Sequence, residues 1–162
     1  MFGCALKLQG FGGFTAAQVA NQHYHKSQAN GGLTYYSTDI QFDTRKRTPE
    51  ELILYFEMGK KGESRLVFIR GTVRAMEYDK KRLRPADAAR HSPAEYAEEP
   101  RRAWFLLEGL ELMEESQAAK LYTPRSDGGM RPLPEAIRES SRNNRFYFTD
   151  EALPSDDDLI KF

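Results

Sequence analysis

The chain has 162 residues, of which 40% are hydrophobic and 30% are charged. This composition is typical of a globular domain and excludes an intrinsically disordered chain. The 24 basic and 24 acidic residues give a formal net charge of zero, which excludes a protein that coats nucleic acid through a global positive field. Local basic surfaces are still expected, because the basic residues cluster at Arg45-Lys46-Arg47, Lys80-Lys81-Arg82 with Arg84, Arg101-Arg102, and Arg138 with Arg142 and Arg145.

The cellular compartment is inferred from the cysteine content and from the absence of long apolar stretches. Cys4 is the only cysteine, so no intrachain disulfide can form and a reducing compartment is the simpler assumption. No stretch has the roughly 18 apolar residues needed to span a bilayer, and the first residues lack the features of a signal peptide. We therefore expect a cytoplasmic protein with no membrane partner.

The N-terminal third is predicted to contain a strand, a loop and a helix. Ala5–Leu8 is apolar and predicts a first strand, and the glycine-rich segment Gln9–Phe14 predicts a loop. Thr15 is expected to cap a helix over Ala16–Ser27, with Gln18 completing a capping box three residues later.

The middle of the chain is predicted to be mostly β-strand. Leu33–Thr38 is rich in aromatic and β-branched residues, as strands are. Glu51–Met58 and Arg65–Tyr78 are predicted to form a hairpin, and Gly71 within the second of these strands indicates a bulge or a sharp bend. Strand character resumes at Ala103–Leu107 and continues, with an interruption, to Met113.

The remaining segments complete a prediction of one α+β domain over residues 1–162. The charged segment Asp79–Arg102 is expected to be an excursion with one or two short helical turns. A short helix is predicted over Pro132–Ser141, a last strand over Arg145–Phe148, and an acidic tail over residues 150–162. We expect a small, strongly bent sheet or open β-barrel of about six strands, with two or three peripheral helices.

Neither of two metal-dependent chemistries is well supported by the sequence. His23 and His25 are two residues apart, a spacing that points them in different directions on a strand or a helix, and Cys4 adds no defined third ligand. Asp79 and Lys81 have an Asp-x-Lys spacing that occurs in metal-dependent nucleases, but these sites need a second carboxylate on a preceding strand. Glu57 and Asp39 are candidates for this second carboxylate, but nothing in the sequence places either of them beside Asp79. We expect no metal and no cofactor.

The glycine-rich loop before the first helix is a weak signal for a nucleotide cofactor. Backbone N–H groups in such loops can bind phosphate. Here no Lys-Ser/Thr follows Gly10–Gly13, and no dinucleotide-binding fingerprint is present. The alternative that this glycine-rich backbone approaches a phosphate or a partner closely stays open.

Aromatic residues on the predicted strands suggest a binding surface. They lie beside small polar residues and near basic clusters, a combination suited to stacking an extruded base. The alternative interpretation is that they fill the core, which is their usual role in strands. The residues concerned are Tyr35, Tyr36, Tyr55, Phe56, Trp104 and Phe105.

The order of features between Leu33 and Phe148 resembles the PUA-like superfamily, in particular its EVE and YTH-type members. The features are Tyr35-Tyr36-Ser37-Thr38, Arg45-Lys46-Arg47, Leu52-Ile53-Leu54-Tyr55-Phe56, Gly71-Thr72-Val73, Trp104-Phe105-Leu106-Leu107 and Arg142–Phe148. The chain departs from the EVE pattern, which commonly has a tryptophan at one of the two tyrosines and Gly-Asp where Glu50-Glu51 stands.

The resemblance implies a non-catalytic module that reads a modified, for example methylated, base in DNA or RNA. Its partner could include a nuclease or motor subunit of a modification-dependent restriction system. By analogy, the base pocket comprises Tyr35, Tyr36, Ser37, Tyr55 and Trp104, and the nucleic-acid backbone is bound by Arg45, Lys46, Arg47, Arg142 and Arg145. Two alternatives stay open: a protein-interaction adaptor or inhibitor domain, and a small metal-dependent nuclease.

Overall fold

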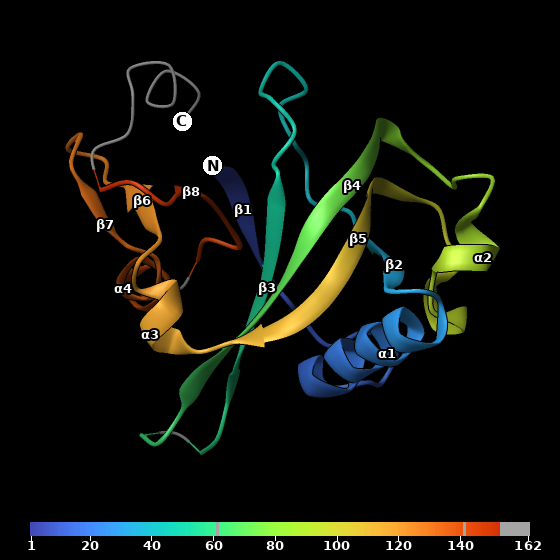
Figure 1. The fold of residues 1–162 in the computed structure, drawn as a ribbon, viewed down its shortest axis with the longest axis horizontal. Coiled ribbons are helices and arrows are strands. Elements are labelled where there is room, and N and C mark those ends of the chain that lie inside the picture. Colours follow the sequence, from blue (N-terminus) through green and yellow to red (C-terminus); the bar gives the residue numbers. More distant parts are fainter. Residues whose placement is uncertain (61, 141, 153–162) are drawn as a thin grey trace. The chain divides into compact units, whose positions relative to one another are not determined.

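The computed structural model describes residues 1–60, 62–140 and 142–152. Short helices lie between groups of strands along the chain (Figure 1). The elements are β1 (Phe2–Lys7), α1 (Ala16–Ala29), β2 (Leu33–Thr38), β3 (Glu51–Met58), β4 (Arg65–Leu83), α2 (Ala88–His91), the 3₁₀ turn η1 (Ala94–Tyr96), β5 (Arg101–Met113), α3 (Glu115–Ala118), β6 (Tyr122–Pro124), β7 (Met130–Pro132), α4 (Leu133–Glu139) and β8 (Arg145–Thr149).

The strands of the described residues belong to one mixed, eight-stranded sheet. Its order is β2-β5-β4-β3-β1-β8-β6-β7, so the sheet is open, with β2 and β7 at its edges. β1 pairs in parallel with β3 and antiparallel with β8, and β2 pairs antiparallel with β5. The predicted α+β class is confirmed, and the resemblance to PUA-like domains stays a prediction.

Two compact units are distinguished within the chain, and each is described separately. The first unit comprises residues 1–9, 49–70 and the described residues from 112 onward, and the second comprises residues 10–48 and 71–111. The long strands β4 and β5 contribute residues to both. The prediction of a single domain over residues 1–162 stays a prediction, and its acidic tail lies outside the described residues from position 153.

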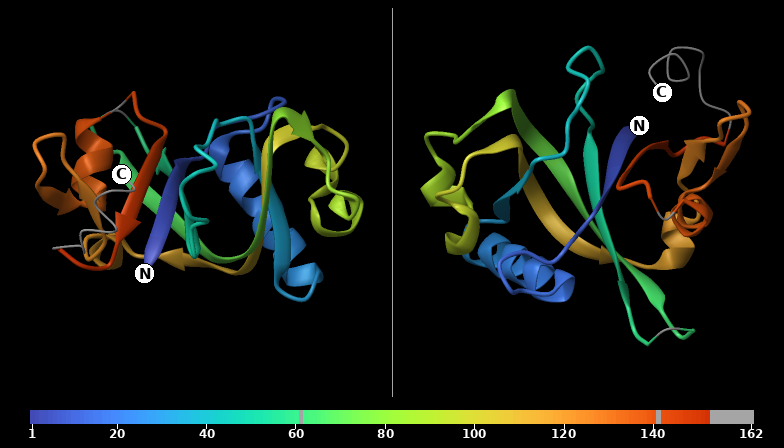
Figure 2. Two further views of the ribbon diagram at one scale, coloured as in Figure 1. Left: turned by 90° about the horizontal axis from the view of Figure 1, so that it is seen from above. Right: turned by 180° about the vertical axis from the view of Figure 1, so that it is seen from behind.

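The first unit is built around two buried neighbouring strands. Five of the six residues of β1 and five of the eight residues of β3 are buried, as expected for strands covered on both faces. Gly3 leaves room for the ring of Phe148, because a Cβ added to Gly3 would lie 2.2 Å from Phe148 Cζ. Helix α4 packs against β6 and β7, an arrangement that both views of Figure 2 also show.

The second unit contains the predicted N-terminal helix. Thr15 Oγ1 accepts from the Gln18 N–H, and the Gln18 side chain accepts from the Thr15 N–H, so the predicted capping box is confirmed. Helix α1 extends to Ala29 and packs against β2. Gly71 lies within β4, where its missing side chain makes room for Leu110, since an added Cβ would lie 2.8 Å from Leu110 Cδ2.

Several elements differ from the sequence prediction. Among the described residues there are four α-helices, where two or three were expected. Helix α2 and η1 confirm the short helical turns predicted within Asp79–Arg102, whereas α3 was not predicted, because a single turn is too short to show a periodic pattern. β4 continues to Leu83, five residues beyond the predicted end at Tyr78, so the excursion between β4 and β5 is shorter than predicted. In the described part of the chain, no helix is long and apolar enough to cross a bilayer.

Candidate nucleic-acid interface

The predicted base-pocket residues are divided between the two units. Tyr35, Tyr36 and Ser37 lie on β2 and Trp104 lies opposite Ser37 on β5, all in the second unit, whereas Tyr55 lies on β3 in the first. The four aromatic residues are between 0 and 8% exposed. The arrangement of β2 and β5 thus brings four of the five predicted residues onto one strand pair, but the aromatic rings belong to the core.

Tyr35 and Trp104 pack on one face of this strand pair. Their ring centroids are 5.6 Å apart at an interplanar angle of 89°, an edge-to-face contact. Trp104 Nε1 donates to the Leu83 carbonyl at 2.8 Å, and the Tyr35 hydroxyl donates to Asp87 Oδ1 at 2.8 Å. Burial raises the pKa of Tyr35, as does its hydrogen bond to Asp87. Each ring therefore already has both its packing and its polar partner.

Tyr36 is buried with His23 on helix α1 and Tyr96 of η1. The His23 ring lies 5.5 Å from Tyr36 and stacks on Tyr96 at 5.1 Å. Burial raises the pKa of Tyr36 to about 12. In the first unit, the Tyr55 hydroxyl donates to the Asn143 carbonyl at 3.4 Å. In this conformation a base could reach these aromatic residues only if the packing around them opened.

The residues predicted to bind the nucleic-acid backbone also fall in both units. Arg45, which is exposed, binds Asp43 through Nε and Nη2, at 3.0 Å in each case. These hydrogen bonds hold the pKa of Asp43 at about 2. Lys46 and Arg47 follow in the same loop, and Arg142 and Arg145 lie in the first unit, with the Arg145 guanidinium 5.6 Å from the Tyr147 ring centroid.

A different set of arginines converges on one residue, Asp39, in the second unit. Asp39 Oδ1 accepts from Arg82 Nε at 3.0 Å and from the Arg102 backbone N–H at 3.2 Å. Asp39 Oδ2 is 3.3 Å from Arg101 Nη1, and the Asp39 carbonyl accepts from Arg102 Nη1 at 3.0 Å. We call Arg82, Arg101 and Arg102 with Asp39 the arginine cluster.

The electrostatics of the arginine cluster favour an ionised Asp39 and leave an excess of positive charge. Burial raises the pKa of Asp39, but the hydrogen bonds from Arg82 and Arg102 and the charge of Arg101 together hold it below its usual value. Arg101 also pairs with Glu99 at 3.2 Å. The exposed basic residues Lys80, Lys81 and Arg84 lie on or next to the same end of β4.

The backbone at the end of β4 contributes to this convergence. Arg82 has a φ of 72°, in the left-handed region that side-chain-bearing residues rarely adopt. The Lys80 carbonyl accepts from Arg102 Nε at 3.1 Å, which ties the end of β4 to the start of β5. The sequence had shown both basic clusters, 80–84 and 101–102, but no local signal indicated that strand pairing would join them at Asp39.

The glycine-rich loop forms a tight hairpin tip. Phe11 and Phe14 exchange both backbone hydrogen bonds, at 3.0 and 2.9 Å, around Gly12 and Gly13. The φ values of 57° and 88° at these glycines are those of a type I′ turn. The Arg101 guanidinium lies 4.6 Å from the Phe11 ring centroid, so the hairpin contacts the arginine cluster.

The residues considered for metal chemistry are engaged in other contacts. His23 Nδ1 lies 2.7 Å from the Val19 carbonyl oxygen, and burial lowers the pKa of His23 to about 4. Asp79 accepts from the Lys81 backbone N–H at 2.8 Å, and Asp39 is bound by arginines. Glu57 lies in the first unit. Within the described ranges, no group of three or more His, Cys, Asp or Glu side chains could hold a metal ion.

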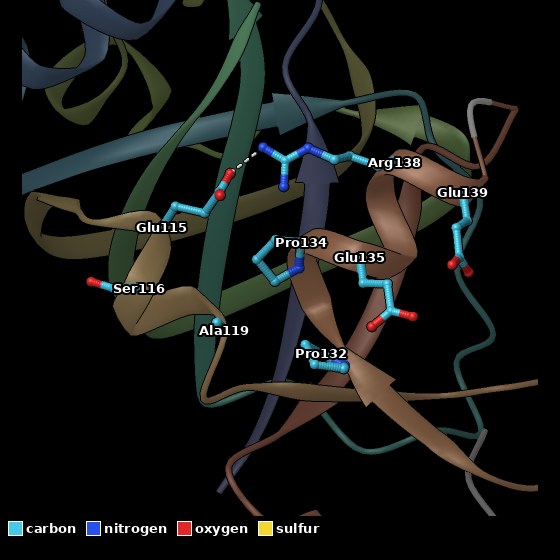
Figure 3. A pocket seen from close by; sticks show the side chains of 8 residues that line it. All are labelled: Glu115, Ser116, Ala119, Pro132, Pro134, Glu135, Arg138 and Glu139. Atoms are coloured by element: carbon cyan, nitrogen blue, oxygen red, sulfur yellow. Dashed lines mark hydrogen bonds and ion pairs between the residues drawn. The ribbon is translucent and has the colours of Figure 1, made fainter.

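The first unit contains an open hollow of about 550 Å³ between α3 and α4 (Figure 3). Apolar atoms make up most of its lining, and three glutamates stand at its rim. Each of these is paired with an arginine: Glu115 with Arg138, Glu135 with Arg125, and Glu139 with Arg131. The rim therefore has no excess charge to select a ligand.

The arginine cluster is thus the site in the described residues with the clearest chemical preference, which is for an anion. Arginine guanidinium groups match phosphate oxygens in geometry and charge. Comparison with protein-family models, with curated protein sequences and with solved structures finds no match to this chain.

Proposed function

We propose that the protein is a non-catalytic nucleic-acid-binding module that contacts the phosphate backbone through the arginine cluster of its second unit. The observation that carries this proposal is the convergence of three arginines on Asp39: Arg82 and Arg101 bind its carboxylate, and the Arg102 side chain binds its carbonyl oxygen. Asp39 and Glu99 offset two of the three arginine charges, which leaves one positive charge in excess. Phosphate contacts from arginine are the main source of affinity in such modules.

The backbone conformation of Arg82 supports a functional role for the cluster. A left-handed φ at a residue with a side chain costs about 1–3 kcal/mol and tends to persist at binding and active sites. Here it accompanies the contact of Arg82 Nε with Asp39. The side chain of Arg82 is 46% exposed, so its guanidinium is accessible to a ligand.

Because the arginine cluster is small and the net charge of the protein is zero, binding of nucleic acid should depend only moderately on salt concentration. If three phosphates are contacted, affinity should fall about 20–40-fold between 50 and 200 mM salt, because each contact releases a condensed counterion. This expectation separates a local site from a protein that coats nucleic acid.

The test is titration of labelled DNA and RNA oligonucleotides, single-stranded and duplex, by fluorescence anisotropy at 50 mM salt. Arg82→Gln should weaken binding about 3–10-fold through loss of one phosphate contact. Arg74→Gln is the matched control, because Arg74 lies on the same strand and pairs with Glu108 at 3.1 Å. The proposal is wrong if no oligonucleotide binds, or if both variants lower affinity equally.

Recognition of a modified base is the finer form of this proposal and is supported by the sequence resemblance. It requires a base to enter among Tyr35, Tyr36 and Trp104, which are buried. Paired oligonucleotides that differ only in one methylated base test it directly. A preference for the methylated oligonucleotide that Tyr36→Phe or Trp104→Phe diminishes would support it, and equal affinities would contradict it.

A further inference from the structure

The hairpin tip at Phe11–Phe14 presents an aromatic surface in the second unit. Phe11 and Phe14 form a directly opposed pair, and side chains of such a pair project from the same face of an antiparallel ribbon. No atom of the described residues would lie within 4 Å of a Cβ added to Gly12 or Gly13, so the tip is open to solvent. The Phe14 side chain is 37% exposed, so part of its ring is accessible to a ligand.

The Phe11 ring is held by two neighbours, and the backbone after Phe14 is held by the helix cap. The Phe11 ring packs against Tyr96, with centroids 5.4 Å apart, and lies under the Arg101 guanidinium at 4.6 Å. Phe14 is followed at once by Thr15, the N-cap whose backbone and side chain are both bound by Gln18. The backbone of the tip is therefore preorganised by the Phe11–Phe14 hydrogen bonds and by the adjoining helix cap, which lowers the entropy lost when a ligand binds to it.

Arg101 joins this aromatic surface to the arginine cluster. The same guanidinium that lies over Phe11 is 3.3 Å from Asp39 Oδ2. Aromatic rings beside a positively charged groove are the arrangement that proteins use to bind single-stranded nucleic acid, with bases on the rings and phosphates on the cations. A duplex offers no such base face, because its bases are stacked on one another.

We propose that the hairpin tip is a base-stacking site, and that the ligand is a single-stranded segment of DNA or RNA. One base stacks on Phe14, and the adjoining phosphate contacts Arg82, whose side chain is 46% exposed, while Arg101 holds the Phe11 ring against the cluster. This inference rests on the proposed function and adds a site distinct from the Tyr35, Tyr36 and Trp104 residues of the sequence prediction.

The position of Phe14 before the helix also suits a structural role, which the test must separate from binding. It directly precedes the N-cap, a position where an apolar side chain often packs on the residue at the fourth helical position, here Val19. Phe14→Leu keeps an apolar side chain for that contact and removes the aromatic ring. Phe14→Trp enlarges the stacking surface. Tyr24→Leu is the matched control, because Tyr24 is another exposed aromatic residue of the second unit, on α1.

The experiment compares labelled oligo-dT and oligo-U with a self-complementary DNA hairpin of the same length, at 50 mM salt. Phe14→Leu should weaken binding of the single strands about 5–50-fold and leave duplex binding unchanged. Phe14→Trp should retain or increase single-strand affinity, and Tyr24→Leu should match the wild type. Melting temperatures of all variants are measured in parallel. The relative affinities for oligo-dT and oligo-U then identify which nucleic acid is preferred.

The outcomes distinguish this inference from the proposed function. If Arg82→Gln weakens binding and Phe14→Leu does not, the arginine cluster binds nucleic acid and the stacking site is wrong. Equal loss of single-strand and duplex binding in Phe14→Leu, with a lowered melting temperature, would also overturn the stacking site by showing a structural role only. Absence of binding to every oligonucleotide would overturn both.

Discussion

His23 stacks on Tyr96 in the second unit, with ring centroids 5.1 Å apart and ring planes at 28°. The histidine is 3% exposed, and because its Nδ1 lies 2.7 Å from a carbonyl oxygen, that nitrogen carries the proton of the neutral ring. Burial among aromatic rings disfavours a second proton and lowers the pKa of His23 to about 4. Helix α1 and η1 are therefore in contact through His23, which is neutral in the folded protein at pH 7.

This contact predicts a loss of stability in mild acid. His23 takes up a proton near pH 6.5 when unfolded but only near pH 4 when folded, so the free energy of unfolding falls as pH drops through that window. The free energy of unfolding should fall by about 1.4 kcal/mol per pH unit, and by about 3 kcal/mol in total across this window. Urea denaturation at pH 7, 5.5 and 4.5 measures it. His23→Gln should reduce the pH dependence of the free energy of unfolding, whereas His25→Gln, at an exposed position, should leave it unchanged. An unchanged slope in His23→Gln would contradict the assignment.

Trp104 provides an intrinsic reporter for the buried aromatic residues of β2 and β5. It is the only tryptophan of the chain, its side chain is fully buried, and its Nε1 is bound to the Leu83 carbonyl. We expect blue-shifted emission that acrylamide quenches poorly, and no change in emission when an unmodified oligonucleotide saturates the protein. Strong quenching on binding would show that the aromatic residues open to the ligand, as insertion of a base requires.

Gly3→Ala should destabilise the first unit. The new Cβ would lie 2.2 Å from Phe148 Cζ within the core, and overpacking of this kind costs roughly 1–3 kcal/mol. Thermal and urea unfolding measure the loss. Gly129→Ala is the control, because its Cβ would meet only exposed side chains. Adding Phe148→Leu to Gly3→Ala should restore part of the stability, and a double variant less stable than both single variants would argue against the clash.

Thr15→Ala should weaken the start of α1. The substitution removes the acceptor of the Gln18 N–H, and loss of an N-cap side chain typically costs about 1 kcal/mol. Urea denaturation measures the change, with Thr44→Ala as a control at an exposed loop position. If the two substitutions cost the same, the cap does not contribute as its geometry indicates.

Elements with strong local patterns could be predicted from the sequence. The predicted bounds of β2 and β3 agree with the structure, because runs of apolar, aromatic and β-branched residues have a high strand preference whatever their partners. The capping box at Thr15 and Gln18 was predicted for the same reason, since it depends only on residues three apart. Strands β6 and β7, which pair with each other, were missed because each has only three residues, too few to show an alternating pattern.

By itself, the sequence determined the α+β class, the helix start and the aromatic and basic character of particular strands, all of which follow from neighbouring residues. Tertiary structure decided which of those side chains are accessible. Tyr36 is covered because α1 and η1 place His23 and Tyr96 near it, and Arg82 meets Arg101 because the end of β4 pairs with the start of β5. Burial and charge convergence depend on contacts between segments far apart in the chain, and local preferences contain no information about them.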